Sequence, residues 1–238
     1  MIIYGLNPVL EALRARRVRA LRVSARTDRR VQEVLRLAAS ADVRVQQVDS
    51  LELDRAARGG LHQGVVADVE DAPDYDVADL VRSAAGAPLI VVLDGVEDPH
   101  NFGAILRAAD AAGADGVVRQ TRRSAAADGV AAKASAGALA HVRVATVVNI
   151  ARAIEELKAA NVWTIGLAAD APERYSDLDL TLPTAFVLGS EGEGLRRLVR
   201  ETCDRTAAIP MLGHVDSLNV SVAAGIVLFE AVRQRRLR

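Results

Sequence analysis

The chain has 238 residues, half of them hydrophobic, and its 30 basic and 31 acidic side chains leave a formal net charge of −1. A single cysteine excludes an internal disulfide and a cysteine-based metal cluster, and the four histidines show no metal-ligand spacing, so we expect no metal. No apolar run is long enough to span a bilayer, and the first residues lack the basic start of a signal peptide. We therefore expect a cytoplasmic protein without a membrane segment.

Arginine supplies nearly all of the positive charge, because Lys133 and Lys158 are the only lysines. A net charge near zero argues against a nucleic-acid partner, whereas the planar guanidinium group matches the geometry of a phosphate. For any one arginine cluster, phosphate binding and a solvated helix face are equally good interpretations. The clusters fall within residues 14–22, 26–30, 119–123 and 233–238.

Residues 1–70 are predicted to form a small α/β domain. The spacing of apolar residues predicts helices over 6–13 and 29–39, and strands over 20–23, 43–48 and 64–69. Asp49, with Glu52 three residues later, indicates the start of a further helix. The acidic stretch that follows predicts a linker over 71–87 with one short helix in it.

Residues 88–238 alternate between strand-like and helix-like segments, which predicts a mostly parallel sheet covered on both faces. The last helix has the clearest pattern, because Val220, Ala224, Val227 and Leu228 fall on one apolar stripe. Strands are predicted over 89–93, 116–119, 142–145, 162–166, 185–188 and 206–209, and helices over 102–112, 128–138, 149–160, 195–201 and 220–235.

Three polar, glycine-containing segments each follow a predicted strand of this second domain. They span residues 94–103, 189–194 and 209–221. In parallel α/β proteins, ligands bind at the carboxyl ends of the strands. We therefore expect the three segments to converge on one site.

Single residues in these segments also have ordinary structural interpretations. Asn101 falls near a helix start, where asparagine is a common cap, and a solvated side chain is as good an interpretation of Arg107 as a functional one. Capping explains at least one of Ser217, Asn219 and Ser221. It does not explain all three, so a ligand-binding role stays open.

The loop over 189–194 has the pattern G-x-E-G-x-G, with a glutamate inside it. A glutamate would repel a pyrophosphate, so the loop is not a Rossmann dinucleotide site, which disfavours a nucleotide-dependent oxidoreductase. A flexible turn is the ordinary interpretation, whereas a ligand here would be cationic or neutral and adenosine-like.

The three segments together suit neither a hydrolase nor a metal site. They contain no cysteine or paired carboxylates, and His100 and His214 are better explained as loop residues. The segments suit a reaction that needs positioning, such as methyl transfer from an already activated sulfonium.

The same segments resemble those of a known family. Residues 98–109, Asp-Pro-His-Asn-Phe-Gly-Ala-Ile-Leu-Arg-Ala-Ala, resemble the first motif of the SpoU (TrmH-like) ribose 2′-O-methyltransferases of the SPOUT superfamily. Residues 186–195 and 209–223 resemble its second and third motifs, and residues 4–13 and 62–67 resemble the opening and closing segments of its L30e-like RNA-binding domain. The whole chain most resembles the branch that methylates guanosine in 23S rRNA. Residues 118–121, Val-Arg-Gln-Thr, depart from the valine and proline of many relatives, which leaves the target nucleotide open.

The resemblance implies a C-terminal SPOUT parallel-sheet domain with a deep trefoil knot over 88–238, and an L30e-like substrate-binding domain over 1–70. It also implies S-adenosylmethionine as the methyl donor, held by backbone at Gly189, Ile209 and Leu218, and a homodimer that acts on rRNA. The resemblance assigns catalytic roles to Arg107, Asn101, Glu191, Asn219 and Ser217. Arginine is a poor base because it holds its proton. Arg107 therefore either assists deprotonation of the ribose hydroxyl or stabilises the developing alkoxide.

Two alternatives within this fold remain. The first is the same reaction on tRNA, which the L30e-like domain disfavours. The second is a non-catalytic RNA-binding or ribosome-assembly protein, which the intact set of motif residues disfavours.

Overall fold

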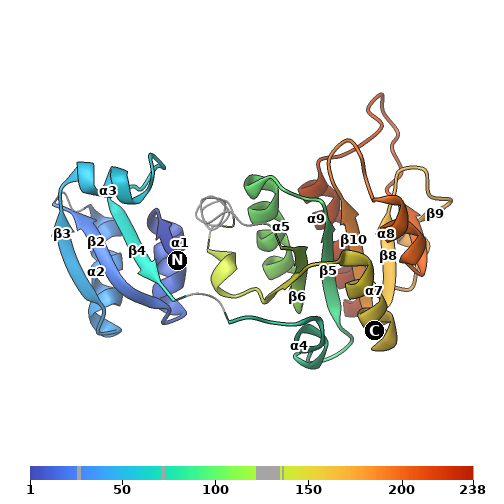
Figure 1. The fold of residues 1–238 in the computed structure, drawn as a ribbon, viewed down its shortest axis with the longest axis horizontal. Helices are drawn as coiled ribbons and strands as arrows, with labels where there is room; N and C mark the ends of the chain where they lie inside the picture. The colour runs from blue at the N-terminus through green and yellow to red at the C-terminus, as the bar shows by residue number, and fades with distance from the viewer. Residues whose placement is uncertain (26–27, 71–72, 122–134, 136, 238) are drawn as a thin grey trace. The chain divides into compact units, whose positions relative to one another are not determined.

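The structure, a computed structural model, describes residues 1–25, 28–70, 73–121, 135 and 137–237 (Figure 1). By its contacts, the chain divides into two units. The first comprises Met1–Pro73 with Arg123–His141, and the second comprises Asp74–Arg122 with Val142–Arg238. Each unit has its own sheet.

The first unit is a four-stranded mixed sheet with helices on both faces. The strands lie in the order β1-β4-β2-β3, with β4 antiparallel to β1 and β2, and β3 parallel to β2. One face packs against α1 and α2, and the alternate residues Tyr4, Val48 and Val66 pack with Leu53 of α3 on the other. The elements are β1 (Ile2–Tyr4), α1 (Leu6–Arg14), β2 (Val18–Ser24), α2 (Arg29–Ser40), β3 (Arg44–Val48), α3 (Ser50–Ala56) and β4 (Val65–Val69).

The helices and longer strands predicted for residues 1–70 are confirmed, and β1 is an addition. Asp49 caps α3 by accepting a 2.8 Å hydrogen bond from the backbone N–H of Glu52, as the sequence indicates. Asp28 caps α2 in the same way. β1 was not predicted, because its three residues are too few to show the alternation of apolar and polar side chains that indicates a strand.

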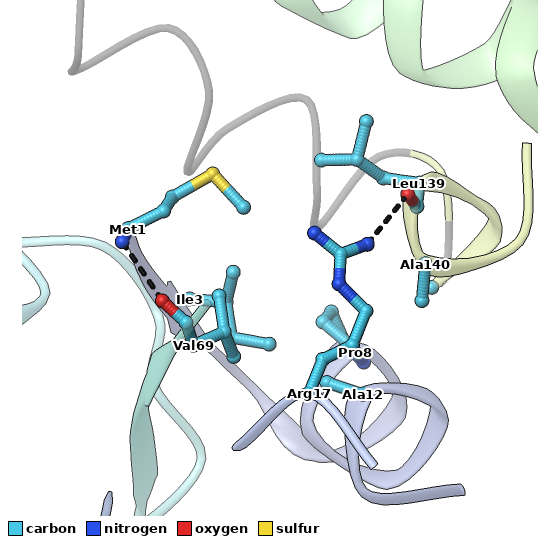
Figure 2. Close-up of a pocket in the computed structure, with 9 residues that line it drawn as sticks. Met1, Ile3, Pro8, Ala12, Arg17, Val69, Leu139 and Ala140 are labelled. Atoms are coloured by element: carbon cyan, nitrogen blue, oxygen red, sulfur yellow. Dashed lines mark hydrogen bonds between the residues drawn. The ribbon is translucent and has the colours of Figure 1, made fainter. Parts of the chain in front are cut away.

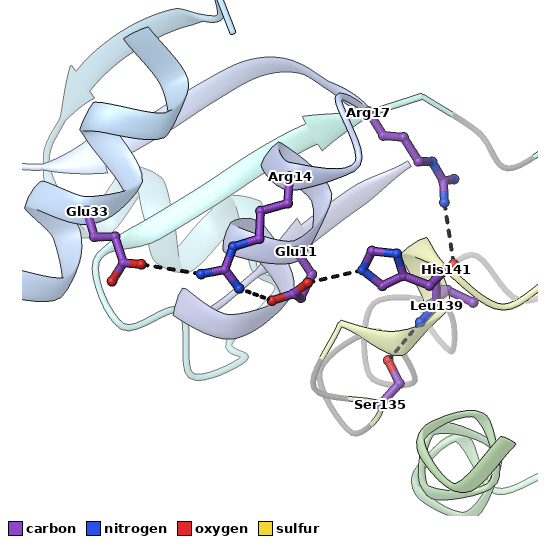
Figure 3. Close-up of polar contacts among 7 residues, drawn as sticks. All are labelled: Glu11, Arg14, Arg17, Glu33, Ser135, Leu139 and His141. Atoms are coloured by element: carbon purple, nitrogen blue, oxygen red, sulfur yellow. Dashed lines mark hydrogen bonds and ion pairs between the residues drawn. The ribbon is translucent and has the colours of Figure 1, made fainter. Parts of the chain in front are cut away.

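A short segment from the chain between β6 and β7 also belongs to the first unit. It contains the 3₁₀ turn η1 (Ala138–Ala140), and Leu139 packs against the core beside α1 (Figure 2). Arg17 donates to the Leu139 carbonyl at 3.4 Å, and His141 Nε2 lies 3.0 Å from Glu11 Oε2 (Figure 3). Gly137, with a φ of 102°, lies so close to α1 that an added Cβ would meet Glu11 Cγ at 2.4 Å. A pocket lies between this segment and the start of the chain, lined by Met1, Pro8 and Leu139 among others. Its volume of about 20 Å³ is enough for one water molecule.

The second unit is a parallel sheet of seven strands in the order β7-β6-β5-β10-β8-β11-β9. Its strands are β5 (Leu89–Asp94), β6 (Gly116–Gln120), β7 (Val144–Val147), β8 (Trp163–Leu167), β9 (Glu173–Arg174), β10 (Thr184–Gly189) and β11 (Arg205–Ala208). β5 is fully buried, and β10 is buried up to Gly189, so both carry continuous apolar runs. In their register, Gly189 lies opposite Asp94 at the carboxyl ends.

Helices cover both faces of this sheet, as predicted. Residues of α4, α7 and α8 share one core with Ile90, Val92, Ala185 and Val187. Helices α5 and α9 pack against each other and against β6 and β10. The helices are α4 (Val77–Arg82), α5 (Pro99–Ala112), α7 (Ile150–Ala159), α8 (Arg197–Thr202) and α9 (Val220–Arg236), with a 3₁₀ turn η2 (Tyr175–Asp177).

The remaining differences from the predicted elements are small. β7 and α8 each begin two residues later than predicted, α5 begins three residues earlier, and β9 and η2 are additions. Most of the helix predicted over 128–138 lies outside the described residues. Within the described ranges, no helix is long and apolar enough to cross a membrane.

Candidate active site

Asn101 lies in the first turn of α5 but does not cap it. The cap is Asp98, whose carboxylate accepts from the backbone N–H groups of His100 at 3.1 Å and Asn101 at 3.3 Å. Pro99 then occupies the first helical position, where its missing N–H costs nothing. The capping interpretation of Asn101 was therefore wrong. Its side chain is free for another role, and the residue is 8% exposed.

Asn219 joins the three predicted segments. Its Oδ1 caps α9 by accepting from the backbone N–H groups of Ser221 and Val222 at 2.9 and 3.4 Å. Its Nδ2 donates to Asn101 Oδ1 at 2.9 Å and to Glu191 Oε1 at 2.6 Å. Because the oxygen serves the helix, the orientation of the amide is fixed by its hydrogen bonds. One side chain thus holds together the starts of α5 and α9 and the loop after β10.

The loop after β10 is a tight turn that only glycine can begin. A Cβ at Gly189 would lie 2.0 Å from the carbonyl carbon of Gly194 and 2.3 Å from the nitrogen of Leu195. Ser190 and Gly194 exchange two backbone hydrogen bonds of 3.1 and 3.0 Å. Gly192 and Gly194 have φ values of 85° and 69°, which side chains rarely tolerate. The turn presents Glu191 to Asn219.

Two predicted catalytic residues lie outside the cluster that Asn101, Glu191 and Asn219 form. Arg107 is exposed on α5, and no hydrogen bond or ion pair links it to another described residue. At about 100° per residue it lies about 120° around the helix from Asn101, so the two do not share a face. Ser217 is exposed and its hydroxyl donates to Asp216 at 3.3 Å. Of the predicted donor-binding residues, Gly189, Ile209 and Leu218 are all partly buried.

Sequence reasoning missed a charged pair beside this cluster. Asp94, the last residue of β5, is 1% exposed, and its carboxylate binds both the backbone and the guanidinium of Arg196. The signal was present, because a carboxylate at the end of a buried strand needs a cationic or hydrogen-bonding partner. The partner was not evident, because 102 residues separate the two.

A free thiol and a metal site are two further kinds of reactive site that the described part of the chain could hold. Burial raises the pKa of Cys203 to about 12, so this thiol stays protonated at neutral pH and is a poor nucleophile. Among the residues that the structure describes, no group of three or more histidine, cysteine or acidic side chains is arranged to hold a metal ion.

Two family models match the chain. One, described as the SpoU rRNA Methylase family, matches residues 88–229, and the other, described as RNA 2′-O ribose methyltransferase substrate binding, matches residues 2–75. The chain belongs to the SpoU rRNA methylase family. The resemblance predicted from the three motifs is therefore confirmed, together with an α/β fold that joins a methylase domain to a substrate-binding domain.

Relatives of this SpoU methylase match over nearly their whole length. A 23S rRNA (guanosine-2′-O-)-methyltransferase RlmB of Yersinia pestis is 43% identical over 242 residues, which cover 100% of this chain and 98% of the relative. The enzyme of the same name from Haemophilus influenzae is 44% identical, covering 98% of this chain and 96% of its own. The SpoU methyltransferase AviRb of Streptomyces viridochromogenes, solved in complex with AdoMet, superposes with a TM-score of 0.83 at 28% identity, covering 100% of this chain and 91% of its own.

Proposed function

We propose that this protein transfers a methyl group from S-adenosylmethionine to the ribose 2′-hydroxyl of a guanosine in 23S rRNA. The observation that carries the proposal is the Asn219 amide, which bonds to Asn101 and Glu191 and so assembles three motifs of the family at one sheet edge. The substrate follows the whole-length relatives, which are named for this reaction.

The residues at the carboxyl ends of β10 and β11 suit the donor. The turn packs against its own backbone at Gly189, whereas a Cβ at Gly192 would meet nothing within 4 Å, so the main chain around Gly192 is open to a ligand that hydrogen-bonds to main-chain groups. The half-buried apolar side chains of Ile209 and Leu218 suit an adenine, and the Glu191 carboxylate suits a cationic sulfonium. When bound, S-adenosylmethionine supplies an electrophilic methyl group that needs no further activation.

The chain itself supplies orientation and charge. Asn219 fixes Asn101 by bonding to its Oδ1, which leaves the Asn101 amide N–H groups to orient the ribose. Glu191 belongs to the loop over residues 189–196, which we call the donor loop, and braces it against α9 through the same amide. Arg107 stabilises the alkoxide that develops as the 2′-hydroxyl loses its proton, or assists that loss when a substrate phosphate orients it. Ser217 supports the loop that leads to Asn219.

The active protein is a homodimer in this proposal. α9 is apolar on two sides: Val220, Ala224 and Val227 are buried, while Val222 and Phe229 are each 50% exposed and are spaced as one further stripe. A second apolar stripe on a helix calls for a partner. A second copy would also explain Arg107, which does not share a face with Asn101 and would serve the site of the other protomer.

Two further properties follow from the family and form part of the proposal. The loops that meet at Asn219 would form a deep trefoil knot, which a chain path followed in a crystal structure would test. The protein would act in the cytoplasm, where its rRNA substrate lies, which cell fractionation would test.

A methylation assay tests the proposed reaction. The protein is incubated with methyl-labelled S-adenosylmethionine and, separately, with 23S rRNA, 16S rRNA and tRNA, and labelled positions are mapped as 2′-O-methyl nucleotides. We expect label in 23S rRNA at one guanosine. Label in tRNA alone would favour the tRNA alternative, and donor binding without transfer to any RNA would favour an assembly role.

A further inference from the structure

A buried carboxylate lies at the carboxyl edge of the sheet, next to both ends of the donor loop. Asp94 is 1% exposed and ends β5, directly opposite Gly189 of β10. Removing a carboxylate from water is costly unless it is paired and hydrogen-bonded. The groups that pair with Asp94 therefore show which part of the protein this carboxylate holds in place.

Both oxygens of Asp94 bind a single residue. Oδ2 accepts the backbone N–H of Arg196 at 2.8 Å, and Oδ1 accepts its guanidinium Nε–H at 2.6 Å. The Nη2 group of Arg196 forms an ion pair with the same Oδ1. Asp94 thus fixes the main chain and the side chain of Arg196 together.

The Arg196 guanidinium extends this connection across the sheet. It donates to Gln120 Oε1 at 3.2 Å, and Gln120 Nε2 donates to the Val148 carbonyl at 2.9 Å. Gln120 ends β6, and Val148 follows β7. One arginine therefore ties the loop after β10 to the ends of three other strands.

We propose that Arg196 is a positioning residue for the donor-binding loop, which Asp94 and Gln120 hold in its binding conformation before the donor arrives. The inference rests on the proposed function. Gly189 fixes the start of the loop and Arg196 fixes its end, while the Ser190–Gly194 pair closes the turn between them. Glu191 is then held within reach of Asn219. A loop that is ordered in advance loses less entropy on binding, so the benefit falls on donor affinity.

Substitution at two adjacent arginines tests the proposal in the full-length protein. Arg196→Gln removes the fork that binds Asp94 and Gln120. Arg197→Gln is the matched control, because Arg197 is exposed and its partner is Glu201, one helical turn along the surface at 3.4 Å. We measure the Kd of S-adenosylmethionine by calorimetry, and its KM and the kcat with 23S rRNA. Arg196→Gln should raise Kd and KM on the order of tenfold while kcat changes no more than about twofold. Arg197→Gln should leave all three unchanged.

Two more variants separate positioning from folding. Arg196→Gln leaves the buried Asp94 carboxylate without its cationic partner, and this lowers the melting temperature whatever the role of the loop. Asp94→Asn combined with Arg196→Gln removes that charge, so the melting temperature should recover while Kd stays raised. Arg196→Lys keeps the charge but not the planar fork, and should give an intermediate Kd.

Three outcomes would overturn the inference. An unchanged Kd and KM in Arg196→Gln would show that the loop needs no such anchor. Recovery of Kd together with the melting temperature in the double variant would reduce Arg196 to a structural role. Failure of the wild-type protein itself to bind S-adenosylmethionine would remove the proposed function, which the variants alone would not do.

Discussion

Arg107 is the residue whose substitution most cleanly separates chemistry from folding. It is exposed on α5 and bonds to no other residue in the described part of the chain, so Arg107→Ala should change the free energy of unfolding by about 0.5 kcal/mol or less. Losing a charge that stabilises an alkoxide should lower turnover on the order of 10²-fold or more. Thermal melting and single-turnover methyl transfer check the two expectations, and Arg107→Lys tests whether the planar fork is needed. Near-normal turnover of Arg107→Ala would make it a surface residue.

Asn219 has two separable roles, because its oxygen caps α9 and its nitrogen holds Asn101 and Glu191. Asn219→Ala should cost about 1 kcal/mol of stability through the lost cap and should also abolish methylation. Asn219→Ser should keep the cap, because serine caps helices as well as asparagine does, yet it has no amide group to bridge the other two residues. Denaturant unfolding and methylation assays compare the two variants. If Asn219→Ser methylates 23S rRNA normally, the bridge is not required.

At the scale of helices and strands, local signals carried most of the prediction. Capping residues and apolar periods place α2, α3, α5 and α9 to within a few residues, because each signal lies inside the element that it specifies. β9, with two residues, has no period to detect.

The site was only partly predictable for a related reason. The three segments could be assigned to one sheet edge because each follows a predicted strand of a parallel sheet. The cap at Asp98 was assigned to Asn101, because two residues within one turn compete for the same N–H groups. The Asp94–Arg196 pair depends on β5 and β10 being neighbours in the sheet, which no local pattern encodes.

The exposed stripe of α9 gives a prediction at the same scale. Phe229 is 50% exposed and projects from a helix whose other side forms the core, so Phe229→Glu should disrupt a dimer without unfolding the protomer. Sedimentation should show monomers for this variant, with methylation lost if the site needs a second copy. Leu198→Glu, on the 61%-exposed Leu198 of α8, is the control and should remain dimeric. A wild-type protein that sediments as a monomer would remove the homodimer from the proposal.

At the scale of the whole molecule, the division of the chain does not follow its sequence order. Residues 137–141 come between β6 and β7 of the large sheet, yet Leu139 packs against the core of the first unit, where Arg17 binds its carbonyl and Glu11 pairs with His141. No local pattern predicts this packing, because α1, beside which Leu139 packs, and Arg17, which binds its carbonyl, lie more than a hundred residues earlier. The domain boundaries over 1–70 and 88–238 stay predictions. A truncation at Pro88 would leave Leu139 without its partners, so the RNA role of the first unit is better tested in the full chain.

Two arginines of the clusters over residues 14–22 and 26–30, Arg16 and Arg29, are candidates for RNA contact. Arg14 pairs with Glu33, and Arg17 binds the Leu139 and Glu70 carbonyls, so both are already engaged. Arg16 and Arg29 are exposed and have no such partner among the described residues. Each arginine that neutralises a phosphate adds about one to the slope of log affinity against log salt concentration. Arg16→Gln with Arg29→Gln should therefore weaken binding to 23S rRNA fragments and lower that slope by about two.

The donor affinity of this double variant should not change, because both substitutions lie in the unit that does not carry Gly189 or Asn219. Arg152→Gln is the control, since Arg152 is also exposed but lies on α7 and pairs with Glu156 at 3.2 Å. Filter binding across a salt series measures the slope, and calorimetry measures donor binding. An unchanged salt slope in the double variant would show that the phosphates are bound elsewhere. The arginines of the second unit, beginning with Arg107, would then be the next to test.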